Sequence, residues 1–234
     1  MATTLAALEV IARDHLTETT AKYWTSAELI RLMNLGVKDL WRSINDLRQE
    51  HFTTLDVTNV TLPAASNTLS GVPADVVRVH MLEVRSLLTS AHAGLRFEPR
   101  PYNDPKFQDA RGATAIDPSS GGVIYYALAG AGGPVAAPTV YVAPTVSAAV
   151  NLALTYVPSL VTLTSSDNNP VPGESDNALV AWTVAFARAK ERDDRTPDPG
   201  WLQIYGNEKQ NILVSLSPRQ DQEPMVATAL FENW

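Results

Sequence analysis

Residues 25–47, TSAELIRLMNLGVKDLWRSINDL, decide how the first part of this chain folds. Thr25 stands three residues before Glu28, which is the spacing of a capping box at the start of a helix. Behind this start signal, apolar residues recur at helical spacing and define one face of an amphipathic helix. That face comprises Leu29, Met33, Gly36, Val37, Leu40, Ile44 and Leu47. The stretch therefore predicts a long helix with one buried side.

Further helical patterns flank this helix and return near the end of the chain. Before it, a short helix is predicted from the spacing of Leu5, Leu8, Ile11 and Ala12. Later, Ser175 or Asp176 is predicted to cap a helix. The buried stripe of that helix is predicted to be Leu179, Trp182, Ala185, Phe186 and Ala189. A last helix is predicted over residues 199–216, with Leu202, Tyr205, Ile212, Leu213 and Leu216 on or near one face.

The middle of the chain has the composition of β-strands. Thr, Val and Leu alternate with period two there, and turn-forming residues separate the runs. The predicted strands cover residues 54–62, 72–84, 123–128, 139–143 and 150–157, with 94–98 as a candidate neighbour of 72–84. Residues 99–122 are predicted to be largely loop, because the prolines among them cannot donate hydrogen bonds to a central strand.

This grouping of strands between helical segments predicts an α+β fold, since strands that do not alternate with helices form mainly antiparallel sheets. The predicted architecture is a helical bundle built from both chain ends, with an inserted, mainly antiparallel β domain and an extended C-terminal tail. The predicted bounds are 1–52 and 174–217 for the helical bundle, 53–173 for the β domain and 218–234 for the tail.

Composition limits what the protein can do. The 234 residues include no cysteine, which excludes disulfides and thiolate metal sites. A net charge of -7 argues against tight binding to DNA, which requires Lys and Arg on the phosphates. The basic residues between Arg188 and Arg195 are interleaved with acidic ones, and we interpret them as a solvated helix end.

No apolar run approaches the ~18 residues of a membrane-spanning helix. The N-terminus lacks the basic start of a signal peptide, so we expect a cytoplasmic protein without a membrane partner.

Motifs that bind phosphate or metal are weak. The glycines Gly130, Gly132 and Gly133 lack the Lys-Ser/Thr of a phosphate loop, and we interpret them as a hairpin loop. The histidines show no zinc-binding spacing on a helix. They are His15, His51, His80 and His92. His80 and His92 flank a possible hairpin, which leaves a transition-metal site as a minor alternative.

An acidic group precedes the second helical segment. Asp167, Glu174 and Asp176 would be suitable for binding Ca²⁺ or for acid–base catalysis. Carboxylates near a helix N-terminus are more commonly caps, because the helix dipole favours negative charge there. We therefore predict no catalytic residue, no metal and no cofactor, and expect the protein not to be an enzyme.

The last residues of the chain carry large apolar groups without a helical pattern. Pro218 and Pro224 interrupt the segment. Its candidate partner-binding residues are Met225, Val226, Leu230, Phe231 and Trp234. Such groups need burial, either against their own domain or on another chain. Aromatic anchors dominate the energetics of protein interfaces, so we expect Phe231 and Trp234 to dock on a partner.

The order of the segments resembles that of a known family. WTSAELIRLMN at 24–34 is followed by VPADVVRV at 72–79, a proline-broken middle, and YVAP at 141–144. LALTYVP at 152–158, Val171-Pro172 and an alanine-rich helix over 177–192 complete the series. From about residue 20 to 216, this order resembles the head–tail connector adaptors of tailed phages, the portal-to-tail adaptors that are similar to tail tubular protein A.

The resemblance implies a structural subunit of the virion neck, assembled in the host cytoplasm. Copies would form a homo-oligomeric ring of twelve that joins the portal protein to a tail or nozzle protein. DNA would pass through the channel without sequence-specific binding, which agrees with the acidic balance. The resemblance also implies that the tail reaches the portal. A neck stopper, another tail-assembly subunit, a ligand-binding or carbohydrate-binding β module, and a hydrolase around Asp167, Glu174 and Asp176 remain alternatives.

Overall fold

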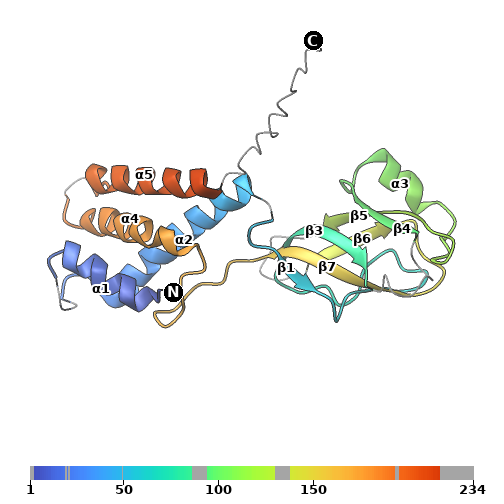
Figure 1. The fold of residues 1–234 in the computed structure, drawn as a ribbon, viewed down its shortest axis with the longest axis horizontal. Coiled ribbons are helices and arrows are strands. Elements are labelled where there is room, and N and C mark those ends of the chain that lie inside the picture. Colours follow the sequence, from blue (N-terminus) through green and yellow to red (C-terminus); the bar gives the residue numbers. More distant parts are fainter. Residues whose placement is uncertain are drawn as a thin grey trace, which may run out of the picture. The chain divides into compact units, whose positions relative to one another are not determined.

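The chain forms two compact units in the computed structural model (Figure 1). The structure describes residues 3–18, 20, 22–48, 50–85, 94–129, 138–192 and 195–216. The first unit combines both chain ends, Met1–Arg48 and Leu163–Trp234, and the second is Gln49–Thr162. The first contains helices, and the second contains strands and one short helix. This arrangement confirms the predicted α+β class with mainly antiparallel strands.

The first unit is a helical bundle in which α2 is the longest member. Its elements are α1 (Leu5–His15), α2 (Ser26–Leu47), the 3₁₀ turn η2 (Gly173–Ser175), α4 (Asp176–Arg188) and α5 (Pro199–Leu216). The capping box of α2 is present: the Glu28 N–H donates to Thr25 Oγ1 at 3.2 Å, and the Thr25 N–H donates to Glu28 Oε2 at 2.9 Å. Both groups would otherwise be unsatisfied donors at the helix start.

The predicted face of α2 is buried from Leu29 to Ile44. The prediction that Leu47 is buried was wrong. This last residue of the helix is 44% exposed, because the buried face ends one turn earlier. Gly36 marks the closest approach to α4. A Cβ at this position would lie 2.9 Å from Cδ1 of Trp182, so α4 packs on α2 only because residue 36 has no side chain.

Residues 163–171 cover the start of α1 and contact the middle of α2. The carbonyls of Asp167 and Ser165 accept the N–H groups of Leu5 and Ala6 at 3.0 and 2.9 Å, which satisfies donors that a helix start leaves free. The buried Asn34 side chain holds the same segment, since it both accepts from and donates to the backbone of Leu163.

Ser175, one of the two predicted candidates, is the N-cap of α4, but its side chain does not bond to the helix backbone. Its buried hydroxyl instead accepts from Asn169 Nδ2 at 2.9 Å. The same amide nitrogen donates to Asp176 Oδ1 at 2.9 Å. The loop before α4 is therefore tied to the helix start through Asn169.

The second unit is built around β7 (Val150–Pro158), which pairs antiparallel with three strands. These are β1 (Thr54–Asp56), β2 (Thr61–Leu62) and β3 (Val76–Val84). A second sheet contains β4 (Leu95–Pro99), β5 (Gly122–Ala129) and β6 (Thr139–Ala143), in that order. Alternate residues of both sheets enclose one apolar core, which includes Val76, Leu82, Ile124, Tyr126, Val140, Val142, Leu152 and Leu154.

Three predictions for this unit were wrong in detail. Residues 54–62 form two strands instead of one, because Asp56 Oδ1 accepts the Thr58 N–H at 2.8 Å and turns the chain. β4 pairs parallel with β5 and not with the 72–84 segment. The predicted loop 99–122 contains α3 (Pro105–Arg111), which Asp104 caps and whose Phe107 is fully buried.

Candidate functional site

The predicted partner-binding residues lie outside the part of the chain that the structure describes. They are Met225, Val226, Leu230, Phe231 and Trp234. His92 and the glycines Gly130, Gly132 and Gly133 also lie outside it. His80 lies on β3. Among the described residues, no group of three His, Asp or Glu side chains could hold a metal ion.

The acidic residues before α4 have separate local roles. Asp167 Oδ2 accepts from the N–H and hydroxyl of Thr164 at 2.7 and 2.8 Å, and these bonds hold the pKa of the carboxyl below its usual range. Asp176 accepts from Asn169, while Glu174 contacts the hydroxyl of Ser215 at 3.5 Å. Asp167 therefore stabilises a turn, while Asp176 and Glu174 make contacts at the start of α4.

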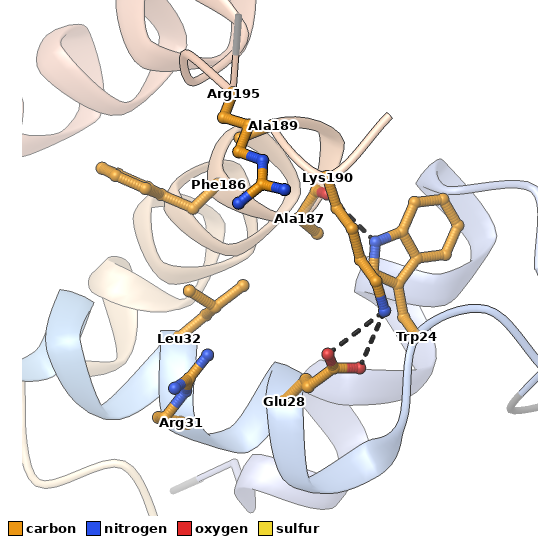
Figure 2. Close-up of a pocket in the computed structure, with 9 residues that line it drawn as sticks. All are labelled: Trp24, Glu28, Arg31, Leu32, Phe186, Ala187, Ala189, Lys190 and Arg195. Carbon is orange, nitrogen blue, oxygen red and sulfur yellow. Dashed lines mark hydrogen bonds and ion pairs between the residues drawn. The ribbon is translucent and has the colours of Figure 1, made fainter. Parts of the chain in front are cut away.

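The helical unit contains an open pocket of about 450 Å³, which we call the α2–α4 groove. It lies between the start of α2 and the end of α4, and Figure 2 shows its walls. The lining residues are Trp24, Glu28, Arg31, Leu32, Phe186, Ala187, Ala189, Lys190 and Arg195. Apolar side chains and alanines thus form much of the wall, and charged groups stand at the rim.

One side of the groove is fixed by contacts between residues far apart in sequence. The indole Nε1 of Trp24 donates to the Ala187 carbonyl at 3.0 Å (Figure 2). Lys190 Nζ lies 3.1 Å from Glu28 Oε1 and donates to the Tyr23 carbonyl at 2.7 Å. Because Trp24 is buried and these bonds hold it, the start of α2 and the end of α4 form a preorganised wall.

Glu28 has an unusually acidic carboxyl. The Thr25 backbone N–H, followed by Lys190 and the Thr25 hydroxyl, lowers the pKa of Glu28 from 4.5 to about 2. Hydrogen bonds to a carboxylate favour its ionised form. Glu28 is therefore charged at neutral pH and serves both the helix cap and Lys190.

The cations around the groove differ in how they are compensated. Arg188 and Arg192 reach Asp198 at 3.9 and 4.0 Å, and Lys190 pairs with Glu28. Arg31 and Arg195 have no ion-pair partner within the described parts of the chain. In Figure 2 the guanidinium of Arg195 points into the space between Phe186 and Lys190. Among the described residues, the groove therefore offers positive charge without an acidic partner beside apolar surface.

Sequence reasoning missed this groove. Arg195 lies in the α4–α5 connection and has a positive φ of 52°. No sequence pattern predicts the position of its side chain. Arg31 belongs to the polar side of α2, where an exposed arginine is ordinary. The basic cluster at 188–195 was the one usable signal, and its interpretation as a solvated helix end overlooked that two of its members line a pocket.

A second polar junction joins α2 to α5. Asp39 accepts from the Tyr205 hydroxyl, and its Oδ2 lies 2.6 Å from Lys209 Nζ. Burial would raise the pKa of Asp39, but the bonds from Lys209 and Tyr205 outweigh it and lower the pKa overall. Burial, together with the bond to Asp39, raises the pKa of Tyr205. These groups fix the position of α5.

Comparison with known proteins places nearly the whole chain in one family. A search of curated proteins gave no match. No helix within the described ranges has the length and hydropathy needed to span a membrane. The family model described as SU10 adaptor protein matches residues 3–229, which include both compact units. This match confirms the resemblance to phage head–tail adaptors seen in the sequence. The chain belongs to the SU10 adaptor protein family, whose members are structural proteins of phages.

Proposed function

We propose that the chain is a neck subunit that forms a twelve-membered ring between portal and tail, around the DNA channel. The family match over residues 3–229 carries this proposal, because it extends through the helical unit, the β unit and part of the tail. The adaptor role requires several surfaces on one subunit.

The helical unit supplies surfaces suitable for a ring. Cyclic rings use two different faces of each subunit, which meet head to tail. α1 and α5 both pack against α4 and flank it in Figure 1. Each exposes large apolar side chains: Val10 is 61% exposed on α1, and Val214 is 63% exposed on α5. We propose that these two faces meet between neighbouring subunits.

The charge balance supports passage of DNA. The chain carries 25 acidic against 18 basic side chains. A channel lined by such subunits gives DNA few cations to neutralise its phosphates, so the DNA is not retained. Sequence-specific DNA binding is not part of the proposed role.

The tail is proposed to contact the portal through Met225, Val226, Leu230, Phe231 and Trp234. The family match includes the first two residues and stops before the last three. Two truncations separate the contributions: one ends after residue 229 and the other after residue 216.

Portal binding of both truncations and of the full chain tests this proposal, with co-sedimentation as the measurement. We expect the chain ending at 229 to bind weakly, because it lacks both aromatic anchors. The chain ending at 216 should not bind, although the fluorescence of its remaining tryptophans, Trp24, Trp41, Trp182 and Trp201, stays that of a folded helical unit. Undiminished binding of the shorter chain would contradict a role for the tail.

Ring formation has its own test. Val10→Asp places a charge on the proposed subunit contact and should abolish ring assembly, measured by sedimentation in the presence of portal. Val161→Asp is the matched control, since Val161 is 71% exposed and lies outside the helical unit. Rings that form equally well with both variants would exclude α1 from the subunit interface.

A further inference from the structure

We infer that the α2–α4 groove holds residues 230–234, LFENW, of the same chain while the subunit is free. In this arrangement an aromatic ring of the segment covers the apolar wall, and Glu232 meets Arg31 and Arg195. The groove would thus shield the tail before it finds its partner. The inference goes beyond the proposed function and does not depend on it, because it concerns the free chain.

The groove has the chemistry of a receptor for an acidic, aromatic peptide. Leu32, Phe186 and Ala189 provide partly exposed apolar surface. Lys190 is neutralised by Glu28 at 3.1 Å, so it adds little free charge. Arg31 and Arg195 remain without an ion-pair partner among the described residues, and both are exposed. A ligand that matches both features carries a carboxylate next to a large apolar group.

The end of the chain carries this combination. After Arg219 the sequence has three carboxylate side chains and no Lys or Arg. Glu232 stands directly after Phe231 and two residues before Trp234. The segment 230–234 thus has one carboxylate and two aromatic rings, and so matches the charge and the apolar surface of the groove. Charge complementarity of this kind selects one partner over others.

The segment is long enough to reach the groove within its own chain. Ser215, near the end of α5, contacts Glu174 at the start of α4, whereas the groove lies at the other end of α4. The 13 residues of α4 correspond to about 20 Å at about 1.5 Å per residue. The 14 residues 217–230 can span up to about 46 Å when extended at about 3.3 Å per residue. A tethered segment also has a high effective concentration at a site within reach.

Introduced cysteines test the inference directly, because the chain has no cysteine of its own. The test variant combines Ala189→Cys in the groove with Asn233→Cys in the segment. The control combines Asp46→Cys with Asn233→Cys. Asp46 has a side chain 67% exposed and lies in the last turn of α2. The start of α2 lies beside the end of α4, where Glu28 meets Lys190, whereas the end of α5 lies beside the start of α4, where Ser215 contacts Glu174. Asp46, at the other end of α2, therefore lies toward the point where the tail begins. A freely moving tail would reach Asp46 at least as often as the groove.

Disulfide formation in the free, full-length chain is followed on non-reducing gels. We expect the groove pair to close within one chain about tenfold faster than the control pair, as a localised segment requires. Adding Phe231→Ala and Trp234→Ala should reduce the rate of the groove pair to that of the control. Arg31→Glu with Arg195→Glu should also slow closure, and Glu232→Arg on that background should restore it.

Three results would overturn the inference. Equal closure rates for the two pairs would mean that the segment does not prefer the groove. Cross-linked dimers in place of closed monomers would mean that the groove takes the segment of another copy. A closure rate of the groove pair that neither the aromatic nor the charge substitutions change would mean that the contact is not specific. None of these results bears on portal binding by the tail, which the truncations measure separately.

Discussion

The contacts that stabilise the helical unit differ in kind from those that stabilise the β unit. In the helical unit, polar groups from distant parts of the chain meet across helices, as in Glu28 with Lys190 and Asp39 with Tyr205 and Lys209. The β unit depends on the backbone ladder around β7 and on an apolar core between two sheets. The helical unit, which also has a buried apolar core, should therefore respond both to charge and pH and to changes in packing, whereas the β unit should respond mainly to lost apolar volume.

This difference suits a subunit with the proposed role. Polar helix contacts are specific in geometry and individually weak, so they can be adjusted when neighbours or a tail segment dock. An apolar core between sheets is close-packed and tolerates little change. Tryptophan offers a convenient way to distinguish the units, because none of the five tryptophans lies within residues 49–162. The four that the structure describes, Trp24, Trp41, Trp182 and Trp201, lie in the helical unit.

The largest effect is expected from the β core. Leu154 is fully buried on β7, between Asp56 of β1 and Leu82 of β3. Leu154→Ala should lower the free energy of unfolding of this unit by about 2–5 kcal/mol, through lost burial and the cavity left behind. Hydrogen exchange of peptides from residues 49–162 measures the change. Leu55→Ala is the control: Leu55 is 61% exposed on β1, and its replacement should cost less than about 0.5 kcal/mol.

A smaller effect is expected where α2 meets α4. Gly36→Leu forces a side chain against Trp182, and we expect a loss of about 1–3 kcal/mol in the stability of the helical unit. The midpoint of denaturation by tryptophan fluorescence measures this loss. Gly206→Ala in α5 is the matched control, since a Cβ there meets nothing within 4 Å and should stabilise the helix by up to about 1 kcal/mol. Equal effects at both glycines would contradict the close packing of α4 on α2.

The smallest effect is expected from pH. The pKa of Glu28 is lower in the folded chain, at about 2, than its ordinary value of 4.5, so the ionised carboxylate stabilises the folded state. This contribution is complete above pH 4.5 and is lost as the pH falls toward 2. Glu28→Gln should therefore flatten the acid side of the stability profile of the helical unit, measured by tryptophan fluorescence.

A partner variant sharpens the pH prediction. Lys190→Gln should remove only part of the pH dependence, because the Thr25 backbone N–H still stabilises the Glu28 carboxylate. An unchanged profile in Glu28→Gln would mean that other carboxyls govern acid unfolding. The pKa of Asp39 is also lowered and marks it as the next group to test.

The sequence predicted the parts of the fold that local patterns determine. The start of α2 was visible because Thr25 and Glu28 satisfy each other within one turn, and its buried face follows a regular period. The pairing of β4 with β5 was not visible, because parallel pairing depends on contacts between segments far apart in the chain. α3 was missed although Asp104-Pro105 is a helix start signal, since the surrounding prolines favoured a loop.

The candidate site was less accessible to sequence reasoning. Phe231 and Trp234 were proposed from the sequence because large apolar groups in a proline-broken segment need burial, and this prediction concerns residues outside the described part of the chain. The groove was missed because Arg31 and Arg195 become neighbours of one pocket only after α4 packs on α2 through Gly36. A pocket formed by tertiary packing has no sequence motif of its own.

Electron microscopy of the full-length chain bound to assembled portal tests the proposed function most directly. We predict a co-axial ring of twelve subunits on the portal, with density for residues 225–234 against the portal surface. Subunits that bind without forming a ring, or a ring whose tails make no contact with the portal, would contradict the account.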